Sequence, residues 1–553
     1  MIKIIQKTTI IVFVVLLALP IIFVNRDPNH ILVLENKTAA KIPALFSGSS
    51  LNRGFISSFE DYWNDNIGFK EPATVLNIAL FYKLFGKLKV TNYIMGKDEH
   101  LYYTADGFSL KTYQGKNKLS EETLGRVLEN LSYALKYFNN HGIEFLFVPI
   151  SDKEGVYPEY YPDSVLQYSS QYKLDQIISY LNNNTKLPVV NLRKALIEGK
   201  SQSYYLYYKN YDCTHWNMKG AFVGYKEIMR YIQKHYKNIN ILSEDDFEIT
   251  LTPSNGTIAH LSSSKFLSKV MSFYDNIYSY KKKGGYNSFA VEDYPMKAID
   301  PAYIKFYRVN NTVQDETKLL ILGDSYIYSF LLDIFGESFR ELYFTSTRDP
   351  DLLEKIVVEY KPDIVIFEIV ERLYGGSDFS FFSELYYLDF LNNSALLFIN
   401  AGSEIQNVEN MVDDVPFTSN SICNGIHYGY EGQSSVSVYG DGVRRSNRYG
   451  TSFSYRFENI PQDQGPLSLV LISYEIWKNA PGQREFRVTI KTDNNSFVIE
   501  KFDPYLLKTK KGVFTFDLPS TSTLLVTFNT REDLLQYGTD SLAFINLIGL
   551  VTK

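Results

Sequence analysis

Residues 319–326 have the sequence LLILGDSY, in which four apolar residues are followed by a glycine and two polar residues. The apolar run predicts a buried strand, and the residues after it predict a helix that extends to Phe335. A strand that leads directly into a helix is the repeating unit of α/β proteins. This order places Ser325 at the carboxyl end of the strand and at the start of the helix.

The same alternation continues on both sides of this stretch. Upstream, Ser120 is a suitable N-cap for a helix to Asn140, and further patterns predict strands at 143–150 and 187–192 around a helix at 171–181. Downstream, the sequence predicts strands at 341–344 and 362–370 around a helix at 350–360. We therefore expect an α/β fold in which helices cover both faces of a mostly parallel sheet.

The pattern changes after about residue 393. Short alternating or apolar runs, separated by Gly, Asn, Asp and Pro, occur at 435–439, 486–491, 513–516 and 524–528, and Asp493-Asn494-Asn495 predicts a hairpin turn. We expect an appended all-β domain, either a β-sandwich or a jelly roll. Tyr439, Tyr474 and Trp477 are candidates to hold a sugar chain there, although aromatic residues of β-domains are more often core.

The N-terminus carries a membrane signal. Lys3 and Lys7 precede an uncharged apolar run over residues 8–24, which is at the lower limit of length for spanning a bilayer. Because no clear cleavage site follows, an uncleaved anchor is favoured over a removed signal peptide, with the main body outside the cytoplasm. The expected organisation is an anchor (1–26), a tether (27–51), an α/β domain (52–390) and a β-domain (395–553).

Composition excludes some classes of function. The 553 residues carry 56 Lys and Arg against 62 Asp and Glu, a net charge of −6, and no basic run offers a site for nucleic acid. The two cysteines, Cys213 and Cys423, are too far apart in sequence to suggest a disulfide framework or a thiolate zinc site. No second ligand stands at a suitable spacing from His215, so we expect no metal.

Two short motifs suggest nucleophilic catalysis. A serine at the end of a parallel strand and the start of a helix lies where backbone N–H groups can hold an oxyanion, although Asp324 or Ser325 could equally well only cap the helix. His215 precedes a predicted helix over 218–232, where it can reach the same sheet edge and act as a base towards Ser325. Asp212 is the obvious acid to orient the His215 ring.

These residues resemble a known family. Gly323-Asp324-Ser325 is similar to the serine block of SGNH-type esterases, and Asp212-x-x-His215 is similar to their Asp-His block, but the two motifs occur in the reverse order. That permuted order, and His215-Trp216, resemble the alginate O-acetyltransferase family of exopolysaccharide acetylation proteins. Further stretches are similar to this family: FEDYWNDNIGF at 59–69, IMGKD at 94–98, VPISDK at 148–153, VYPE at 156–159, and KPDIV at 361–365 leading to VER at 370–372.

The resemblance implies a membrane-tethered, extracytoplasmic enzyme that acetylates a secreted polysaccharide such as alginate or cellulose through an acetyl-serine. It needs no cofactor, because a membrane-bound acyltransferase partner or a small ester would supply the acetyl group near a polymer synthase or export complex. By the same resemblance, Gly323 and Tyr326 would support the oxyanion site, and Trp216, Arg372 and Lys153 would contact substrate. A polysaccharide acetylesterase and a non-catalytic glycan-binding scaffold are the alternatives.

One position departs from the family. Members carry Asp-x-His-Trp, with the acid two residues before the histidine, whereas Cys213 occupies that position here and Asp212 stands three residues before His215. A neutral thiol is a poor partner for an imidazolium, since an ordinary cysteine is mostly protonated at neutral pH. We therefore expect Asp212 to orient the ring, with Cys213 as a bystander; another acid is the remaining possibility.

Overall fold

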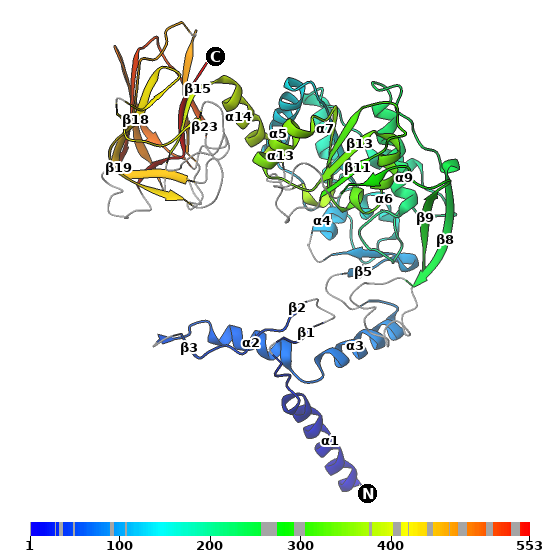
Figure 1. Ribbon diagram of the computed structural model, residues 1–553. Helices are drawn as coiled ribbons and strands as arrows, with labels where there is room; N and C mark the ends of the chain where they lie inside the picture. The colour runs from blue at the N-terminus through cyan, green and yellow to red at the C-terminus, as the bar shows by residue number, and fades with distance from the viewer. Residues whose placement is uncertain are drawn as a thin grey trace. The chain divides into compact units, whose positions relative to one another are not determined.

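The computed structural model describes most of the chain (Figure 1). The described residues are 2–27, 29–32, 37–47, 50–88, 93–104, 108–255, 274–291, 305–374, 379–401, 411–418, 420–438, 446–463, 465–473, 484–504, 513–531 and 542–552. The chain divides into two compact units: the first comprises 1–128, 144–346 and 362–376, and the second comprises 129–143, 347–361 and 377–553. Each unit is described by itself.

The N-terminal part of the first unit is mainly helical. Its elements are α1 (Ile2–Ile22), β1 (Ile31–Leu32), β2 (Lys37–Thr38), β3 (Phe46–Ser47), β4 (Ser50–Leu51), α2 (Phe55–Asn66) and α3 (Lys70–Phe85). The stretch that the sequence assigns to a tether thus contains two short antiparallel strand pairs. Within the described residues, no helix combines the length and the apolar character that crossing a membrane requires.

A six-stranded sheet forms the centre of the first unit (Figure 1). Its order is β10-β11-β13-β12-β14-β7, from β7 (Glu144–Ile150), β10 (Phe289–Ala290), β11 (Lys305–Val309), β12 (Lys318–Leu322), β13 (Glu341–Thr345) and β14 (Ile364–Val370). The four strands β13, β12, β14 and β7 run parallel to one another. Strand β11 pairs antiparallel with β13, and β10 pairs antiparallel with β11. The expected α/β fold with a mostly parallel sheet is therefore confirmed.

Strand β12 lies where the order of the sheet reverses. The chain passes from β12 to its neighbour β13 and then returns to β14 on the other side of β12. Every residue of β14, and all of β12 except Lys318, is buried, as expected for strands covered on both faces. The carboxyl end of a strand at such a reversal is the usual position of a functional site in open parallel sheets. Ser325 follows β12 at this position.

Helices and smaller sheets complete the elements between the N-terminal part and the sandwich. The helices of the first unit are α4 (Phe108–Gln114), α6 (Lys153–Val156), α7 (Lys173–Asn184), α8 (Leu192–Glu198), α9 (Met218–Ile232), α11 (Ser325–Tyr328) and α12 (Leu332–Ser338). The second unit includes α13 (Pro350–Tyr360), α14 (Phe381–Ser394) and the larger part of α5 (Glu121–Asn140). Two antiparallel hairpins pair β5 (Tyr93–Met95) with β6 (Leu101–Tyr103) and β8 (Phe247–Asn255) with β9 (Tyr274–Lys282).

Two predicted elements differ from the structure. The strand expected at 187–192 is reduced to one parallel bridge between Val189 and Phe147, because α8 begins at Leu192 with Asn191 as its N-cap. The helix expected to run from the Ser325 region to Phe335 is divided into α11 and α12. At the first of these differences, the capping side chain of Asn191 overrides the apolar pattern.

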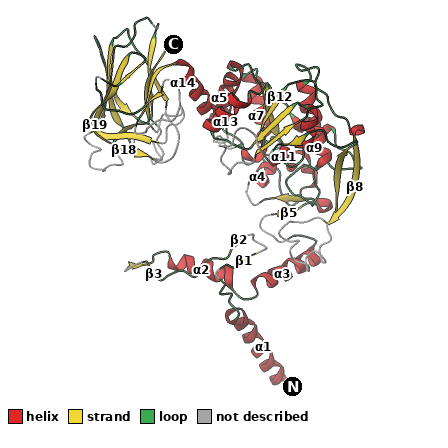
Figure 2. Cartoon of the chain, in the orientation of Figure 1, coloured by secondary structure: helices red, strands yellow, loops and turns green. Residues whose placement is uncertain are grey.

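The second unit contains a β-sandwich (Figure 2). One sheet has the order β16-β15-β26-β20-β23 and the other β17-β18-β19-β24-β21-β22, with β25 paired to β19. The strands are β15 (Ala395–Asn400), β16 (Met411–Val412), β17 (Ile422–Cys423), β18 (Ile426–Val438), β19 (Ser446–Glu458), β20 (Leu467–Ile472), β21 (Phe486–Thr492), β22 (Ser496–Phe502), β23 (Val513–Asp517), β24 (Thr523–Thr530), β25 (Ala543–Ile545) and β26 (Leu547–Thr552).

The two sheets of the sandwich share one apolar core. Leu469 and Leu550 from the first sheet pack in the same cluster as Tyr455 and Phe528 from the second. The hairpin predicted at Asp493-Asn494-Asn495 joins β21 to β22. The appended β-sandwich is therefore confirmed, whereas the candidate sugar-binding residues Tyr439, Tyr474 and Trp477 lie outside the described residues.

Candidate active site

The turn after β12 is fixed by backbone hydrogen bonds to both neighbouring strands. Leu322 is in register with the last residue of β13, and the Gly323 N–H donates to the Thr345 carbonyl at 3.1 Å. On the other side, the Asp324 N–H donates to Oε2 of the fully buried Glu368 of β14 at 2.8 Å. A Cβ at position 323 would lie only 2.8 Å from that oxygen, so the close approach requires glycine.

Asp324 caps the helix that begins with Ser325. Its Oδ1 accepts the Tyr326 N–H at 2.9 Å, and its Oδ2 accepts the Val370 N–H at 3.1 Å. The N–H groups of Gly323 and Tyr326 are thus both engaged within the turn. In the part of the chain that the structure describes, the Ser325 N–H has no protein acceptor, so it is the backbone donor of the turn that remains for a ligand oxygen.

The histidine lies on a loop that precedes α9. Asn217 accepts the Gly220 N–H at 3.0 Å and caps this helix, whose buried face includes Phe222, Tyr225 and Met229 at helical spacing. An isolated antiparallel bridge between Tyr207 and Trp216 closes the loop. These contacts hold the residues between them at the carboxyl edge of the sheet.

Asp212 organises the loop around itself. Its Oδ1 accepts the Thr214 N–H and hydroxyl, both at 2.8 Å, and the His215 N–H at 3.1 Å. Its Oδ2 lies 2.7 Å from His215 Nδ1. One carboxylate therefore shapes the turn and orients the imidazole ring, as the sequence suggested for Asp212.

The loop and the turn meet at the sheet edge. His215 Nε2 lies 2.8 Å from Ser325 Oγ, and the His215 side chain is about one-fifth exposed. Together with Asp212, this gives a continuous hydrogen-bonded chain from carboxylate through imidazole to hydroxyl. Such an arrangement can deprotonate the serine and stabilise the imidazolium that results.

Electrostatics assign different states to Asp212 and Cys213. Burial by itself would raise the pKa of Asp212, but hydrogen bonds from His215 and Thr214 hold it below its ordinary value, so the carboxylate is charged. Burial, with Asp212 alongside, raises the pKa of the Cys213 thiol to about 12. Cys213 packs against the apolar cluster of Ile78, Ala79 and Leu101. The acid at the ring is Asp212 despite the departure from the family spacing.

Tyr326 and Trp216 lie beneath the site. The Tyr326 hydroxyl donates to the Thr214 carbonyl at 2.5 Å, and its ring centroid is 4.8 Å from that of His215. The Trp216 indole N–H donates to the Tyr326 carbonyl at 3.1 Å, and the side chain is fully buried. Tyr326 thus supports the histidine through its ring and hydroxyl, while the Trp216 side chain belongs to the core.

The two predicted basic substrate contacts have different surroundings. Lys153 is buried, and its ammonium donates to the carbonyls of Leu101 and Lys209 at 2.7 and 2.8 Å, so it joins two segments and does not face solvent. The Arg372 guanidinium forms an ion pair with Asp152 and lies 5.6 Å from the Tyr326 ring centroid. Of the two, only Arg372 lies next to a residue that contacts His215.

Two residues that shape the site, Thr214 and Glu368, are not among those predicted from the sequence. Thr214 occurs between the acid and the histidine, and its hydroxyl links Asp212 Oδ1 and His215 Nδ1 at 2.8 Å each. Glu368 is an acidic residue within the apolar run IVIFEIV of β14, and an acid in a fully buried strand is itself a signal of a specific partner. Within the described residues, no cluster of His, Cys, Asp and Glu could hold a metal ion.

Three comparisons relate the chain to known proteins. Residues 93–276 match the family model described as an SGNH hydrolase-like domain, acetyltransferase AlgX. No curated protein matches the chain. Among solved structures, Bacillus cereus PatB1 is 17% identical over 47% of this chain and 92% of its own, with a TM-score of 0.37.

Two further structures are similar at comparable levels. The O-acetyltransferase domain of Pseudomonas putida AlgJ is 15% identical over 54% of this chain and 99% of its own, with a TM-score of 0.36. Pseudomonas aeruginosa AlgX is 12% identical over 83% of this chain and 94% of its own, with a TM-score of 0.34. The family match contains the loop with Asp212 and His215, and over residues 93–276 it confirms the predicted resemblance to an SGNH hydrolase-like acetyltransferase domain.

Proposed function

We propose that this protein transfers acetyl groups to hydroxyls of a secreted polysaccharide through an acetylated Ser325. The observation that carries the proposal is the 2.8 Å contact between His215 Nε2 and Ser325 Oγ, with Asp212 2.7 Å from the other ring nitrogen. The match to an acetyltransferase domain family supports acetyl as the transferred group.

The first half-reaction loads the serine. His215 Nε2 removes the hydroxyl proton as Ser325 Oγ attacks the acetyl carbonyl, and the carbonyl oxygen becomes an oxyanion within reach of the Ser325 N–H. Collapse of the tetrahedral intermediate breaks the bond to the leaving group, which takes the proton from His215. Asp212 stabilises the imidazolium while the proton resides there.

The second half-reaction unloads it. A sugar hydroxyl gives its proton to His215 Nε2 and attacks the carbonyl of the acetyl-serine. The new ester leaves with the acetyl group, and the proton returns to Ser325 Oγ. Water in place of the sugar would give acetate, so the same residues would then perform polysaccharide deacetylation.

The cellular setting is part of the proposal. An alginate- or cellulose-like exopolysaccharide outside the cytoplasm would be the acceptor, and a membrane-bound O-acyltransferase near a polymer synthase or export complex would supply acetyl without a cofactor. The C-terminal β-sandwich would hold the polymer. The match of residues 93–276 to the AlgX acetyltransferase domain supports an acceptor of this class.

The decisive experiment supplies p-nitrophenyl acetate as donor with and without oligosaccharide acceptors. We expect acetylated oligosaccharide in the mass spectrum, and an acetyl adduct on the peptide that contains Ser325 when the acceptor is omitted. Release of acetate with every acceptor, and no acetylated sugar, would reject transfer in favour of hydrolysis.

A matched pair of serine variants tests the assignment of the nucleophile. Ser325→Ala should abolish both the adduct and the transfer, while Ser329→Ala, at an exposed serine one turn further along, should retain both. Full biological activity of Ser325→Ala, together with no labelling of the wild type by a serine reagent, would instead support a glycan-binding scaffold.

A further inference from the structure

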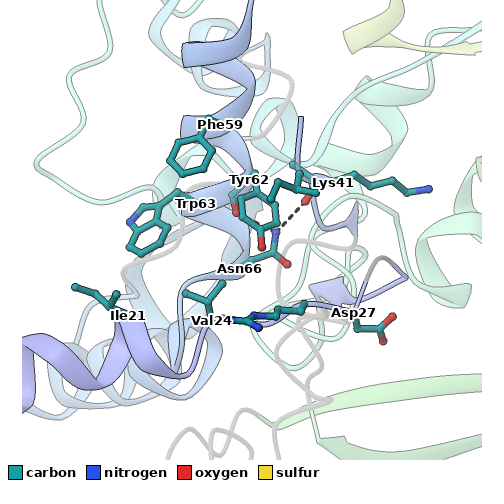
Figure 3. A pocket seen from close by; sticks show the side chains of 11 residues that line it. Ile21, Val24, Asp27, Lys41, Phe59, Tyr62, Trp63 and Asn66 are labelled. Atoms are coloured by element: carbon teal, nitrogen blue, oxygen red, sulfur yellow. Dashed lines mark hydrogen bonds between the residues drawn. The ribbon is translucent and has the colours of Figure 1, made fainter. Parts of the chain in front are cut away.

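The stretch FEDYWNDNIGF at 59–69 has no role in the site around Ser325, and it forms one wall of a separate cavity (Figure 3). This cavity has a volume of about 750 Å³ and lies between the end of α1, the residues after β2 and helix α2. Its lining residues are Ile21, Val24, Arg26, Asp27, Ala40, Lys41, Ile42, Phe59, Tyr62, Trp63 and Asn66. We call it the N-terminal cavity.

Buried polar groups hold the walls of the N-terminal cavity together. Asn66, which is 2% exposed, donates from Nδ2 to the carbonyls of Ala40 and Tyr62 at 2.8 and 2.9 Å, and its own carbonyl accepts the Asn25 N–H at 2.7 Å. Asp65 Oδ2 accepts the Ala40 N–H at 3.0 Å. One end of α2 thereby ties down both the segment after α1 and the segment after β2, so the cavity is built into the fold.

The interior wall of the cavity is apolar and aromatic. Figure 3 shows Phe59 and Trp63 of α2 on one side and Ile21 and Val24 near the end of α1 on the other. The rings of Phe59 and Trp63 stack with centroids 6.5 Å apart, yet Phe59 remains 39% exposed and Ile21 58% exposed. Apolar side chains left open to water around a concave surface favour an apolar occupant.

The rim of the cavity is positively charged. Arg26 and Lys41 contribute two cations, and Asp27 contributes one carboxylate, whose Oδ1 accepts the Asn29 N–H at 2.9 Å. Among the described residues, neither Arg26 nor Lys41 forms an ion pair, so both cations are available to a ligand. The rim therefore favours an anionic group next to an apolar chain.

We propose that the N-terminal cavity binds one phospholipid with an anionic headgroup. The acyl chain lies along Phe59, Trp63 and Val24, and the phosphate lies at Arg26 and Lys41. An acidic peptide or a polysaccharide would leave the apolar wall uncovered, whereas an amphiphile satisfies the wall and the rim together. The cavity shares no residue with the site around Ser325, so lipid binding is independent of acetyl transfer.

Trp63 provides a direct reporter in the full-length chain. Vesicles of phosphatidylglycerol with brominated acyl chains should quench the part of the tryptophan emission that is lost in Trp63→Phe, since bromine quenches only at close range. The other two tryptophans, Trp477 and the fully buried Trp216, are present in both proteins, so the difference between the two proteins reports on Trp63. Equal quenching of the wild type and Trp63→Phe would overturn the proposal.

The headgroup preference is tested with matched arginine variants. Arg26→Gln should weaken binding to phosphatidylglycerol vesicles about fivefold and leave binding to phosphatidylcholine vesicles unchanged, because one cation near an anionic headgroup is removed. Arg53→Gln, at an exposed arginine outside the cavity, is the control. Because α1 is the same in all variants, any attraction of its apolar side chains to the vesicles is also the same and cancels when the variants are compared.

Two other results would overturn the proposal. Equal weakening by Arg26→Gln and Arg53→Gln would indicate a diffuse charge effect and no lipid site. A change in Trp63 emission that depends on protein concentration and not on lipid would indicate that a second copy of the chain covers the cavity. Release of p-nitrophenol from p-nitrophenyl acetate should be unchanged in all three variants, which verifies that they are folded.

Discussion

The serine turn and the histidine loop meet in one site, but they are held in different ways. The loop is shaped mainly by one of its own residues, since Asp212 accepts hydrogen bonds from Thr214 and His215, two and three positions further on, and the Tyr326 hydroxyl adds a bond to the Thr214 carbonyl. The turn depends on distant strands, since Gly323 and Asp324 bond to Thr345, Glu368 and Val370.

This difference separates two ways in which a substitution can damage the site. A change in the loop removes a group that contacts the imidazole and should alter catalysis directly. A change beneath the turn displaces the nucleophile and should alter catalysis through position. Loop variants and turn variants that unfold at the same temperature as the wild type show whether the two kinds of substitution act in these two ways.

The largest effect is expected at Asp212. Asp212→Asn should lower turnover by about 10³ to 10⁴, because the amide no longer stabilises the imidazolium or fixes the tautomer of His215. Acetyl transfer to an oligosaccharide is the measurement, with thermal unfolding to verify the fold. Cys213→Ser is the matched control and should change transfer little. If Cys213→Ser were damaging and Asp212→Asn harmless, the histidine ring would be oriented by the residue two positions before it, as in the family motif.

A smaller effect is expected beneath the turn. Glu368→Leu leaves the buried Asp324 N–H without its acceptor and should shift the serine, which lowers kcat by about 10² with little change in KM. Glu368→Gln keeps an oxygen that can accept the same N–H and should retain most of the activity. If the two variants were equally active, the serine turn would not depend on this hydrogen bond.

Thr214 tests how far the loop relies on its second hydrogen bond. Thr214→Val removes the hydroxyl that donates to Asp212 Oδ1 and should lower turnover about tenfold, in line with the loss of one hydrogen bond to a charged group. Thr214→Ser preserves the hydroxyl and should behave like the wild type. A loss as large as that of Asp212→Asn would mean that the hydroxyl, and not the carboxylate alone, holds the ring.

The smallest effect concerns stability at the end of β14. Burial, together with the nearby Asp152 carboxylate, raises the pKa of Glu371 from 4.5 to about 7. The folded protein then holds this proton more tightly than the unfolded chain does. The contribution to the free energy of unfolding is complete below about pH 4.5 and is lost as the pH rises to about 7, with an upper size of about 3 kcal/mol.

Urea unfolding across this pH range measures the Glu371 contribution. The midpoint should fall more steeply with rising pH for the wild type than for Glu371→Gln, whose amide is neutral throughout. Parallel pH profiles for the two proteins would contradict the raised pKa. Turnover should be affected less than in the Glu368 variants, since the Glu371 carboxylate bonds to Ser151 and Leu174 and not to the serine turn.

Much of the architecture follows from the sequence itself. The apolar runs of β7, β12 and β14 are long and uninterrupted enough to predict buried parallel strands, and Asn217 before an amphipathic pattern predicts α9 with its observed bounds. The predicted strand at 187–192 fails because Asn191 caps a helix inside that apolar run, and a local side-chain cap is stronger than pattern there.

For the site, the sequence determined which residues have the chemistry and which motif shapes the loop. The spacing of Asp212, Thr214 and His215 is local, so its hydrogen bonds form wherever the loop folds. Only the tertiary structure decided that the His215 ring meets Ser325, that Trp216 and Lys153 are buried, and that Glu368 holds the serine turn. These outcomes depend on parallel strands that are far apart in sequence and in register at one edge, and no local pattern encodes that register.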